Sequence, residues 1–203
     1  VGGKHAMAPV DIRIVKSKIR NDIKEYRKSL SPRDKEEMVR SILRRITSVP
    51  EYQEADLLLC YISTPIEVNT RPLVEDAWRR GKRVAAPYCI AGTRNMDFYL
   101  ITSFDQLAVR TYGVWEPIAD QCEKLTDISS GVCIVPALSY DLEGYRMGYG
   151  GGYYDRFLAR FGGFKLGIVY DSCVRRRLAH GRYDLPVDLV VTDRRILHFP
   201  PRG

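Results

Sequence analysis

Hydrophobic residues follow a helical period near the start of the chain. Apolar positions recur there at spacings of three and four residues, which predicts an amphipathic helix from about Lys16 onward. A second helix is expected from Pro32, because Ser31 is a favourable N-cap and proline suits the first helical position. Pro50 is expected to end that helix. The apolar positions of the first helix are Ile19, Ile23, Tyr26 and Leu30.

Further along, short apolar runs alternate with helical segments. Runs of this kind, bounded by turns, are typical of strands that are covered on both faces. The pattern predicts a single α/β domain with a mainly parallel twisted sheet flanked by helices, in a Rossmann-like three-layer arrangement with a ligand cleft at the strand carboxyl ends. Residues 119–131 are expected to form a disordered or variable loop. The predicted strands are 57–62, 83–88, 96–101, 132–138, 164–170 and 189–192, and helices are expected near 71–80 and 154–161.

Length and composition fit one such domain. The chain has 203 residues, of which 45% are hydrophobic, so residues 10–203 suffice for one core. Residues 1–9 lack periodicity and are expected to be a flexible tail or an expression scar. No apolar stretch approaches the roughly 20 residues of a membrane helix. The five cysteines are scattered without a C-x-x-C pair, which favours free thiols and a cytoplasmic location.

The charge balance points to anionic partners. Lys and Arg number 32 against 25 Asp and Glu, a formal net charge of +7. Nucleic acid, an anionic membrane surface, or substrates with phosphates and carboxylates all fit this excess. Four basic residues form a stripe beside the apolar face of the first helix, either as a solvated surface or as the border of a cleft. They are Lys16, Arg20, Lys24 and Arg27.

A glycine-rich loop links the predicted strand 132–138 to the predicted helix 154–161. Four glycines between Gly148 and Gly152 permit close backbone approach and let successive N–H groups point at one anion. Arg146 at the start of the loop offers a delocalised charge that suits phosphate oxygens. A strand-to-helix turn with unusual dihedral angles is the structural alternative. Asp155 is either a partner of the helix dipole or a magnesium ligand, and Asp188 is expected to face the same site.

Several blocks of the sequence resemble the 5-formyltetrahydrofolate cyclo-ligase family, also called methenyltetrahydrofolate synthetase. The resemblance extends over nearly the whole chain and is most specific in the arginine- and glycine-rich block. It implies a single cyclo-ligase domain, and an enzyme that depends on ATP and magnesium. The matching blocks are 16–20, 62–70 and 146–156, with 185–193 also in agreement.

The implied reaction converts 5-formyltetrahydrofolate to 5,10-methenyltetrahydrofolate with release of ADP and phosphate. Phosphorylation of the formyl oxygen would activate the formyl carbon for attack by the N10 amine. Because the nucleophile belongs to the substrate, the protein mainly positions two ligands and stabilises phosphoryl charge. The resemblance thus implies small-molecule partners, and neither nucleic acid nor membrane as partner. A monomer is expected.

The resemblance also implies roles for individual residues. Lys16, Arg20 and Arg146 are expected to contact the ATP phosphates and to act in catalysis. Ile62, Glu67 and Tyr112 are expected at the folate, although a loop aromatic such as Tyr112 is often simply packed. Magnesium is expected at Asp155 and Asp188. The rest of the expected nucleotide cradle consists of Met147, Gly148, Tyr149, Gly150, Gly151, Gly152, Tyr153 and Tyr154.

The chain departs from the family pattern at two places. Gly151 stands where some members carry a basic residue, and residues 173–177 lack the glutamine and acidic residues expected there.

Two other functions remain open. A nucleic-acid-binding module would need basic and aromatic residues interleaved on one surface, whereas most basic residues here are dispersed. A protein that binds nucleotide or folate without catalysis would keep the same motifs.

Overall fold

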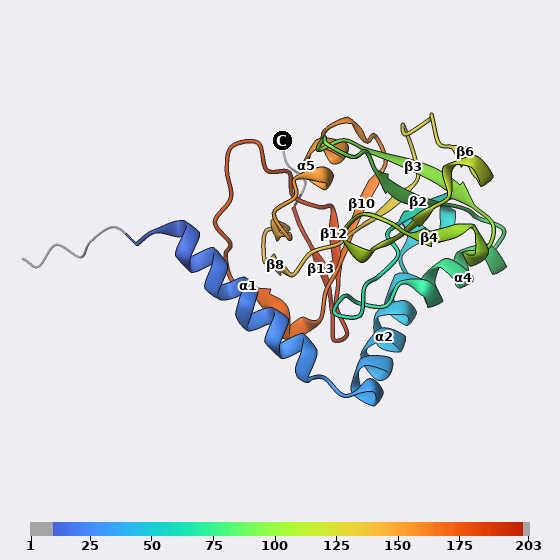
Figure 1. The fold of residues 1–203 in the computed structure, drawn as a ribbon. Coiled ribbons are helices and arrows are strands. Elements are labelled where there is room, and N and C mark those ends of the chain that lie inside the picture. Colours follow the sequence, from blue (N-terminus) through green and yellow to red (C-terminus); the bar gives the residue numbers. More distant parts are fainter. Residues whose placement is uncertain (1–9, 201–203) are drawn as a thin grey trace, which may run out of the picture.

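An eight-stranded sheet forms the centre of the protein in the computed structural model, which describes residues 10–200 apart from the side chain of Thr111 (Figure 1). The strand order is β13-β12-β10-β7-β1-β2-β3-β6. The five strands from β12 to β2 are parallel and the others pair antiparallel, which confirms a mainly parallel sheet. The strands are β1 Leu57–Cys60, β2 Arg83–Cys89, β3 Met96–Ile101, β6 Glu123–Lys124, β7 Val132–Val135, β10 Phe164–Ile168, β12 Leu189–Val191 and β13 Ile196–His198.

Helices and two small sheets complete the described part of the chain. In Figure 1, α2 and α4 lie on one side of the central sheet and α5 on the other. The helices are α1 Ile12–Ser29, α2 Pro32–Ile46, α3 Pro50–Glu54, α4 Arg71–Arg79 and α5 Tyr153–Arg160, with 3-10 turns η1 Phe104–Gln106, η2 Thr111–Gly113, η3 Ala119–Gln121 and η4 Asp171–Cys173. The small sheets contain β4 Leu107–Val109 with β5 Trp115–Pro117, and β11 Val174–Arg175 with β8 Ser139–Asp141 and β9 Arg146–Met147.

The connections that leave β1 and β7 run toward opposite edges of the central sheet. From β1 the chain passes through α4 to β2 on one side, and from β7 it passes through α5 to β10 on the other. Right-handed crossovers in opposite directions place their helices on opposite faces of the sheet. Ligands of such sheets bind at this point of divergence, beyond the carboxyl ends of the strands.

Local sequence signals explain most helix boundaries. The Ser31 side chain accepts a hydrogen bond from the Asp34 amide at 3.1 Å, so α2 begins at Pro32 as predicted. The same helix ends at Ile46, and Pro50 begins the short α3 instead of ending α2. The first helix starts earlier than expected, because Asp11 caps it. No helix among residues 10–200 is long and apolar enough to cross a membrane.

Two expectations about loops and strands need correction. The segment 119–131 is ordered rather than disordered, because η3 and β6 lie within it and Leu125 is buried, with its amide donating to Phe98 O at 2.8 Å. The strand predicted at 57–62 ends at Cys60, where the chain leaves the sheet. β1 and β7 are nevertheless buried along their whole lengths, as their apolar sequences predict.

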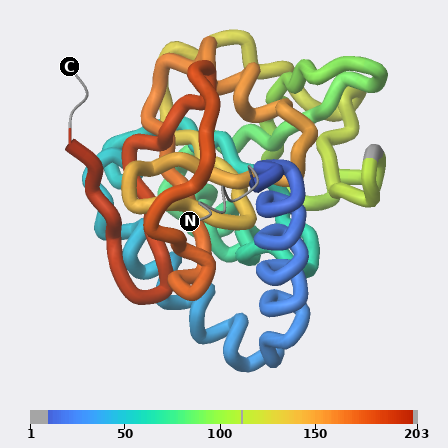
Figure 2. Tube along the Cα trace, turned by 90° about the vertical axis from the view of Figure 1, so that its left-hand side faces the viewer, coloured from blue at the N-terminus to red at the C-terminus, as the bar shows by residue number. Residues whose placement is uncertain are grey.

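A buried arginine fixes α1 against the rest of the molecule, along one side of it (Figure 2). Arg27 is only 1% exposed. Its guanidinium donates hydrogen bonds to the carbonyl oxygens of Ile66, Ala137 and Leu138 at 2.9–3.1 Å. The expectation that Arg27 belongs to a surface stripe with Lys16 and Arg20 is therefore wrong. Its charge is used to satisfy backbone acceptors of the two segments that follow β1 and β7.

Candidate functional site

A cleft of about 770 Å³ opens where β1 and β7 end. Tyr61 and Ile62, which directly follow β1, line it together with Pro136, which directly follows β7. These two strands are the pair between which the connections diverge. The cleft therefore lies at the position that the α/β sequence pattern predicts for a ligand.

The glycine-rich loop forms one wall of the cleft. It follows β9 and reaches α5 through Gly152, whose φ of 73° is left-handed, and Gly150 has a φ of 95°. No side chain caps the first turn of α5, so its amide groups remain open to an anion. This arrangement agrees with the predicted phosphate cradle. The loop residues that line the cleft are Met147, Gly148, Tyr149, Gly150, Gly151, Gly152, Tyr153 and Tyr154.

Arg146 is the most deeply placed cation of this wall. Its side chain is 9% exposed, and one guanidinium nitrogen lies 2.8 Å from the Asp155 carboxylate. The Nε of Arg146 and the hydroxyl of Tyr154 are both buried without a hydrogen-bond partner. Burial also raises the pKa of Tyr154 well above its usual value, so the phenol stays protonated. Two residues that line the cleft thus each have one buried donor without a partner.

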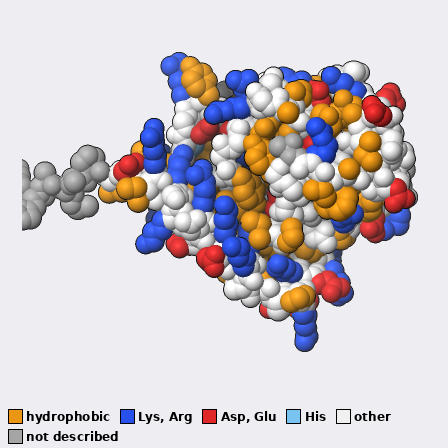
Figure 3. Space-filling model, in the orientation of Figure 1, with side chains coloured by type: hydrophobic (Ala, Val, Ile, Leu, Met, Phe, Trp, Pro, Cys, Tyr) orange, Lys and Arg blue, Asp and Glu red, His pale blue; other side chains and the backbone are white. Residues whose placement is uncertain are grey.

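Helix α1 supplies further cations to the cleft. Lys16 and Arg20 line the cleft, and Arg20 Nε donates to the Gly148 carbonyl at 3.2 Å. The Lys24 ammonium lies 6.0 Å from the centre of the Tyr149 ring. Figure 3 shows Lys and Arg side chains gathered along α1. Lys16 and Arg20 of the basic stripe therefore border the cleft, whereas Lys24 does not line it and lies near Tyr149.

The residues expected at the folate also line this cleft. Glu67 accepts hydrogen bonds through one carboxylate oxygen from the Thr64 amide at 2.9 Å and the Thr64 hydroxyl at 2.8 Å. Burial raises the pKa of Glu67, while the bonds from Thr64 oppose that rise. Ile62 is 1% exposed. Tyr112 lies at the other extreme, 83% exposed, with a left-handed φ of 58° at the turn between β4 and β5.

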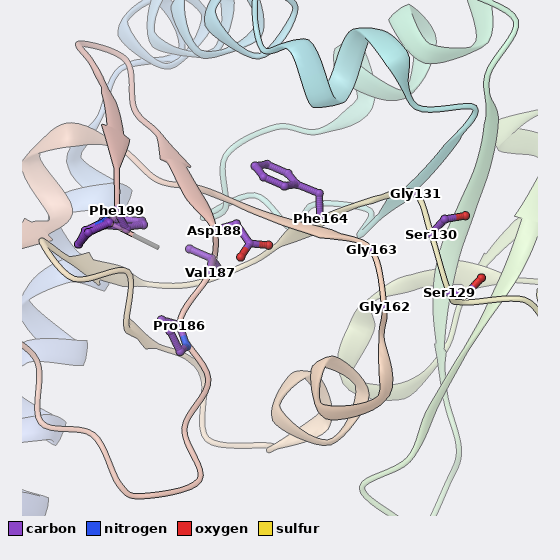
Figure 4. A pocket seen from close by; sticks show the side chains of 11 residues that line it. Ser129, Ser130, Gly131, Gly162, Gly163, Phe164, Pro186, Val187, Asp188 and Phe199 are labelled. Carbon is purple, nitrogen blue, oxygen red and sulfur yellow. The ribbon is translucent and has the colours of Figure 1, made fainter. Parts of the chain in front are cut away.

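Asp188 does not lie in this cleft. It immediately precedes β12 and therefore sits at the amino end of the parallel strands, opposite the edge that Asp155 occupies. Its carboxylate accepts a hydrogen bond from the Lys165 amide at 2.8 Å. Figure 4 shows it in a second pocket, near Val187 and Phe164. The structure thus does not bring together the predicted pair Asp155 and Asp188, because a residue that enters a parallel strand lies at the wrong edge.

A preformed metal cage is absent from residues 10–200, where no group of three or more His, Cys, Asp or Glu side chains is placed to hold an ion. Asp155 is 45% exposed, and one of its oxygens binds Arg146. Magnesium commonly takes only one or two carboxylates and completes its shell with water and substrate phosphates. Asp155, at the start of α5 beside the glycine-rich loop, has the exposure that such a role needs.

Sequence reasoning missed a polar cluster on the β4–β5 side of the cleft. Glu116 lines the cleft, is 2% exposed and lies 3.3 Å from the Arg110 guanidinium. Arg110 in turn lies 3.9 Å from the centre of the Tyr88 ring. Burial raises the pKa of Glu116 and, with Glu116 nearby, raises the pKa of Cys89 to about 12. The sequence did contain one signal for this cluster, because Glu116 is a charged residue in an otherwise apolar short strand.

The cleft can be compared with known proteins. The sequence profile of the 5-formyltetrahydrofolate cyclo-ligase family matches residues 13–193. The chain belongs to this family. The matched range contains every residue that lines the cleft, from Lys16 to Leu185. The resemblance seen in the sequence is confirmed.

Individual cyclo-ligases agree over most of their length. The chain is 29% identical to the 5-formyltetrahydrofolate cyclo-ligase of Escherichia coli strain K12, in a match that covers 86% of this chain and 98% of that protein. It is 24% identical to the enzyme of the same name from Mus musculus, with 76% and 78% covered. The family likeness thus extends from bacteria to a mammal.

Solved structures show the same fold. The NMR structure of Aquifex aeolicus 5,10-methenyltetrahydrofolate synthetase superposes with a TM-score of 0.80 at 29% identity, covering 93% of this chain and 95% of that one. The Mycoplasma pneumoniae 5,10-methenyltetrahydrofolate synthetase gives a TM-score of 0.69 at 21% identity, covering 88% and 98%. This member of the cyclo-ligase family therefore has the same α/β fold as these two proteins.

Proposed function

We propose that the protein converts 5-formyltetrahydrofolate to 5,10-methenyltetrahydrofolate and couples the conversion to cleavage of ATP into ADP and phosphate. The observation that supports this most directly is the buried guanidinium of Arg146, beside a four-glycine loop and the open amino end of α5. Such a site suits phosphate oxygens. The same cleft contains a half-buried carboxylate, Glu67, which suits the amide and amino donors of a pterin.

The proposal divides the cleft between two ligands. Arg146, Lys16, Arg20 and the loop up to Tyr154 bind the triphosphate. Ile62 and Glu67 bind the folate, and Tyr112 closes over a ring from the mouth of the cleft, where its exposed side chain lies. The proposed active unit is a monomer acting on small molecules.

The proposed chemistry needs two steps. The formyl oxygen of the folate attacks the γ-phosphorus of ATP, an O–P bond forms, the bond to the bridging oxygen breaks, and ADP leaves. The substrate N10 then attacks the formyl carbon, its proton passes to solvent, and the C–O bond breaks as the N5 lone pair expels inorganic phosphate. Arg146, Lys16 and Arg20 offset the charge on the transferred phosphoryl group.

No protein nucleophile takes part in this scheme. The cysteine that lines the cleft, Cys89, has a pKa raised to about 12 by burial and by Glu116, so it remains a protonated thiol at neutral pH. The neutral thiol is a poor nucleophile. The protein contributes position and charge, which is sufficient when the attacking amine belongs to the substrate.

The decisive experiment mixes the purified protein with 5-formyltetrahydrofolate and MgATP. We expect a rise in near-ultraviolet absorbance as the methenyl product forms, together with one ADP for each product molecule. Reactions without ATP serve as the control. Folded protein that produces no absorbance change overturns the proposal, and ligand binding without product formation identifies a non-catalytic binding protein. Steeply salt-dependent RNA binding without turnover favours a nucleic-acid-binding module.

Magnesium, when bound, would neutralise phosphate charge and help to align the triphosphate, and Asp155 is the residue proposed to hold it. We expect Asp155→Asn to raise the magnesium concentration needed for half-maximal turnover about tenfold, because one charged ligand is lost. Titrating Mg²⁺ at saturating ATP and folate measures this.

Asp188→Asn is the matched control for that titration. The amide oxygen of asparagine still accepts the hydrogen bond from the Lys165 amide. Because Asp188 lies at the amino end of the parallel strands, the magnesium dependence of turnover in Asp188→Asn should equal that of the wild type. A shift in Asp188→Asn with none in Asp155→Asn contradicts the placement of the metal.

A further inference from the structure

Arg94 lies beside the end of the glycine-rich loop. It belongs to the turn between β2 and β3 and lines the same cleft as Arg146. A Cβ atom added to Gly152 would lie 3.6 Å from Arg94 Cδ and 3.7 Å from one guanidinium nitrogen. The Arg94 side chain therefore lies against the residue that caps α5.

Hydrogen bonds within the turn and from α5 hold the turn that contains Arg94. Within the turn, the Thr93 hydroxyl donates to Ile90 O at 2.8 Å and accepts from the Asn95 amide at 3.0 Å. Arg160, at the end of α5, donates to Met96 O at 2.9 Å. The backbone on either side of Arg94 is thus fixed relative to α5, and the guanidinium needs only side-chain rotation to reach an anion there.

The cations already assigned to the cleft place no positive charge on the side of the glycine-rich loop that faces the β2–β3 turn. Arg146 is paired with Asp155, and Arg20 donates to the loop carbonyl of Gly148. Lys16 projects from α1. Residues 147–152 contain no Lys or Arg. Among the described residues, the guanidinium of Arg94 has neither an ion-pair nor a hydrogen-bond partner.

We propose that Arg94 binds a phosphate group of the nucleotide and supplies, from the β2–β3 turn, the positive charge that the glycine-rich loop itself lacks. The inference rests on the proposed function, since it requires a nucleotide triphosphate at the amino end of α5. Arg94 then completes a set of cations that approach the phosphates from α1, from β9 and from the β2–β3 turn. A guanidinium suits this role because it can bond two phosphate oxygens at once.

Equilibrium binding to the intact protein tests the inference. We expect Arg94→Ala to raise the Kd for MgATP about tenfold or more, while the Kd values for adenosine and for 5-formyltetrahydrofolate stay at those of the wild type. Arg156→Ala is the matched control. Arg156 lies in the first turn of α5 and donates a hydrogen bond to Asn95 Oδ1 at 3.4 Å, but it does not line the cleft. Its MgATP affinity should not change.

A second variant separates charge from packing. Adding Gly151→Lys to Arg94→Ala places a cation in the loop itself, and we expect it to recover a large part of the lost MgATP affinity. The new Cβ would lie 3.0 Å from the Tyr153 ring, which must move by a few tenths of an ångström. Thermal unfolding of each variant verifies the fold.

The outcomes are distinguishable. Wild-type MgATP affinity in folded Arg94→Ala overturns the inference and leaves the proposed function intact. An equal loss in Arg156→Ala, or an equal loss of adenosine affinity, also overturns it, because the effect would then come from packing of the turn. Wild-type protein that does not bind MgATP at all refutes the proposed function, and the role of Arg94 with it.

Discussion

Replacing Arg146 with alanine is expected to lower kcat/KM for the cyclo-ligase reaction about a thousandfold. The guanidinium is almost completely removed from water, and the Asp155 carboxylate holds one of its nitrogens in place at 2.8 Å, so it is a preorganised donor for the ligand. Removing one preorganised donor from such a site typically costs a factor of about 10²–10³, and a charged arginine at a phosphoryl group costs more. Steady-state absorbance kinetics measure the loss.

The fold should survive this substitution. Asp155, the partner left behind, is 45% exposed and can be hydrated. The melting temperature of Arg146→Ala is therefore expected to stay close to that of the wild type. Arg146→Lys keeps the charge without the planar pair of donors and should recover only part of the activity. Wild-type kcat/KM in a folded Arg146→Ala protein would remove Arg146 from the mechanism.

The second large effect concerns stability. Arg27→Met is expected to lower the free energy of unfolding by about 3 kcal/mol, because three backbone carbonyls lose a charged donor in a buried site. Methionine retains the length of the arginine stem, so the loss measures hydrogen bonds and charge more than volume. Urea unfolding followed by circular dichroism gives the value.

Lys28→Met is the control on the same helix. Lys28 and its partner Glu25 are both exposed, and surface pairs of this kind contribute about 0–1 kcal/mol. We also expect Arg27→Met to weaken MgATP binding, since α1 positions Lys16 and Arg20 over the cleft. A stability change no larger than that of Lys28→Met would show that Arg27 does not anchor α1.

The fold class and the geometry of the glycine-rich loop were predictable because both depend on local signals. Continuous apolar runs identify strands that are buried on both faces, as β1 and β7 are. The cap at Ser31 fixes the start of α2 within one residue. A cluster of glycines before a helix specifies a tight loop that leaves the amino end of the helix open, with little help from distant residues.

The errors arose where one residue depends on distant parts of the chain. The helical period placed Arg27 beside Lys16 and Arg20, but the period does not tell which segments will cover each face. The segments that follow β1 and β7 cover Arg27 and leave Lys16 and Arg20 open to the cleft. Asp188 was assigned to the metal although it precedes its strand, and the direction of a parallel strand places such a residue at the opposite edge.

The sequence by itself determined the alternation of strands and helices, the glycine-rich cradle, and the excess of positive charge. Only the tertiary structure decided which of those charges meet in one cleft. Arg94 shows the difference most clearly, because it lies in a turn without any motif and reaches the cradle only through the packing of the β2–β3 turn on α5. Motifs record local geometry, whereas a binding site is assembled from contacts between residues that are far apart in the chain.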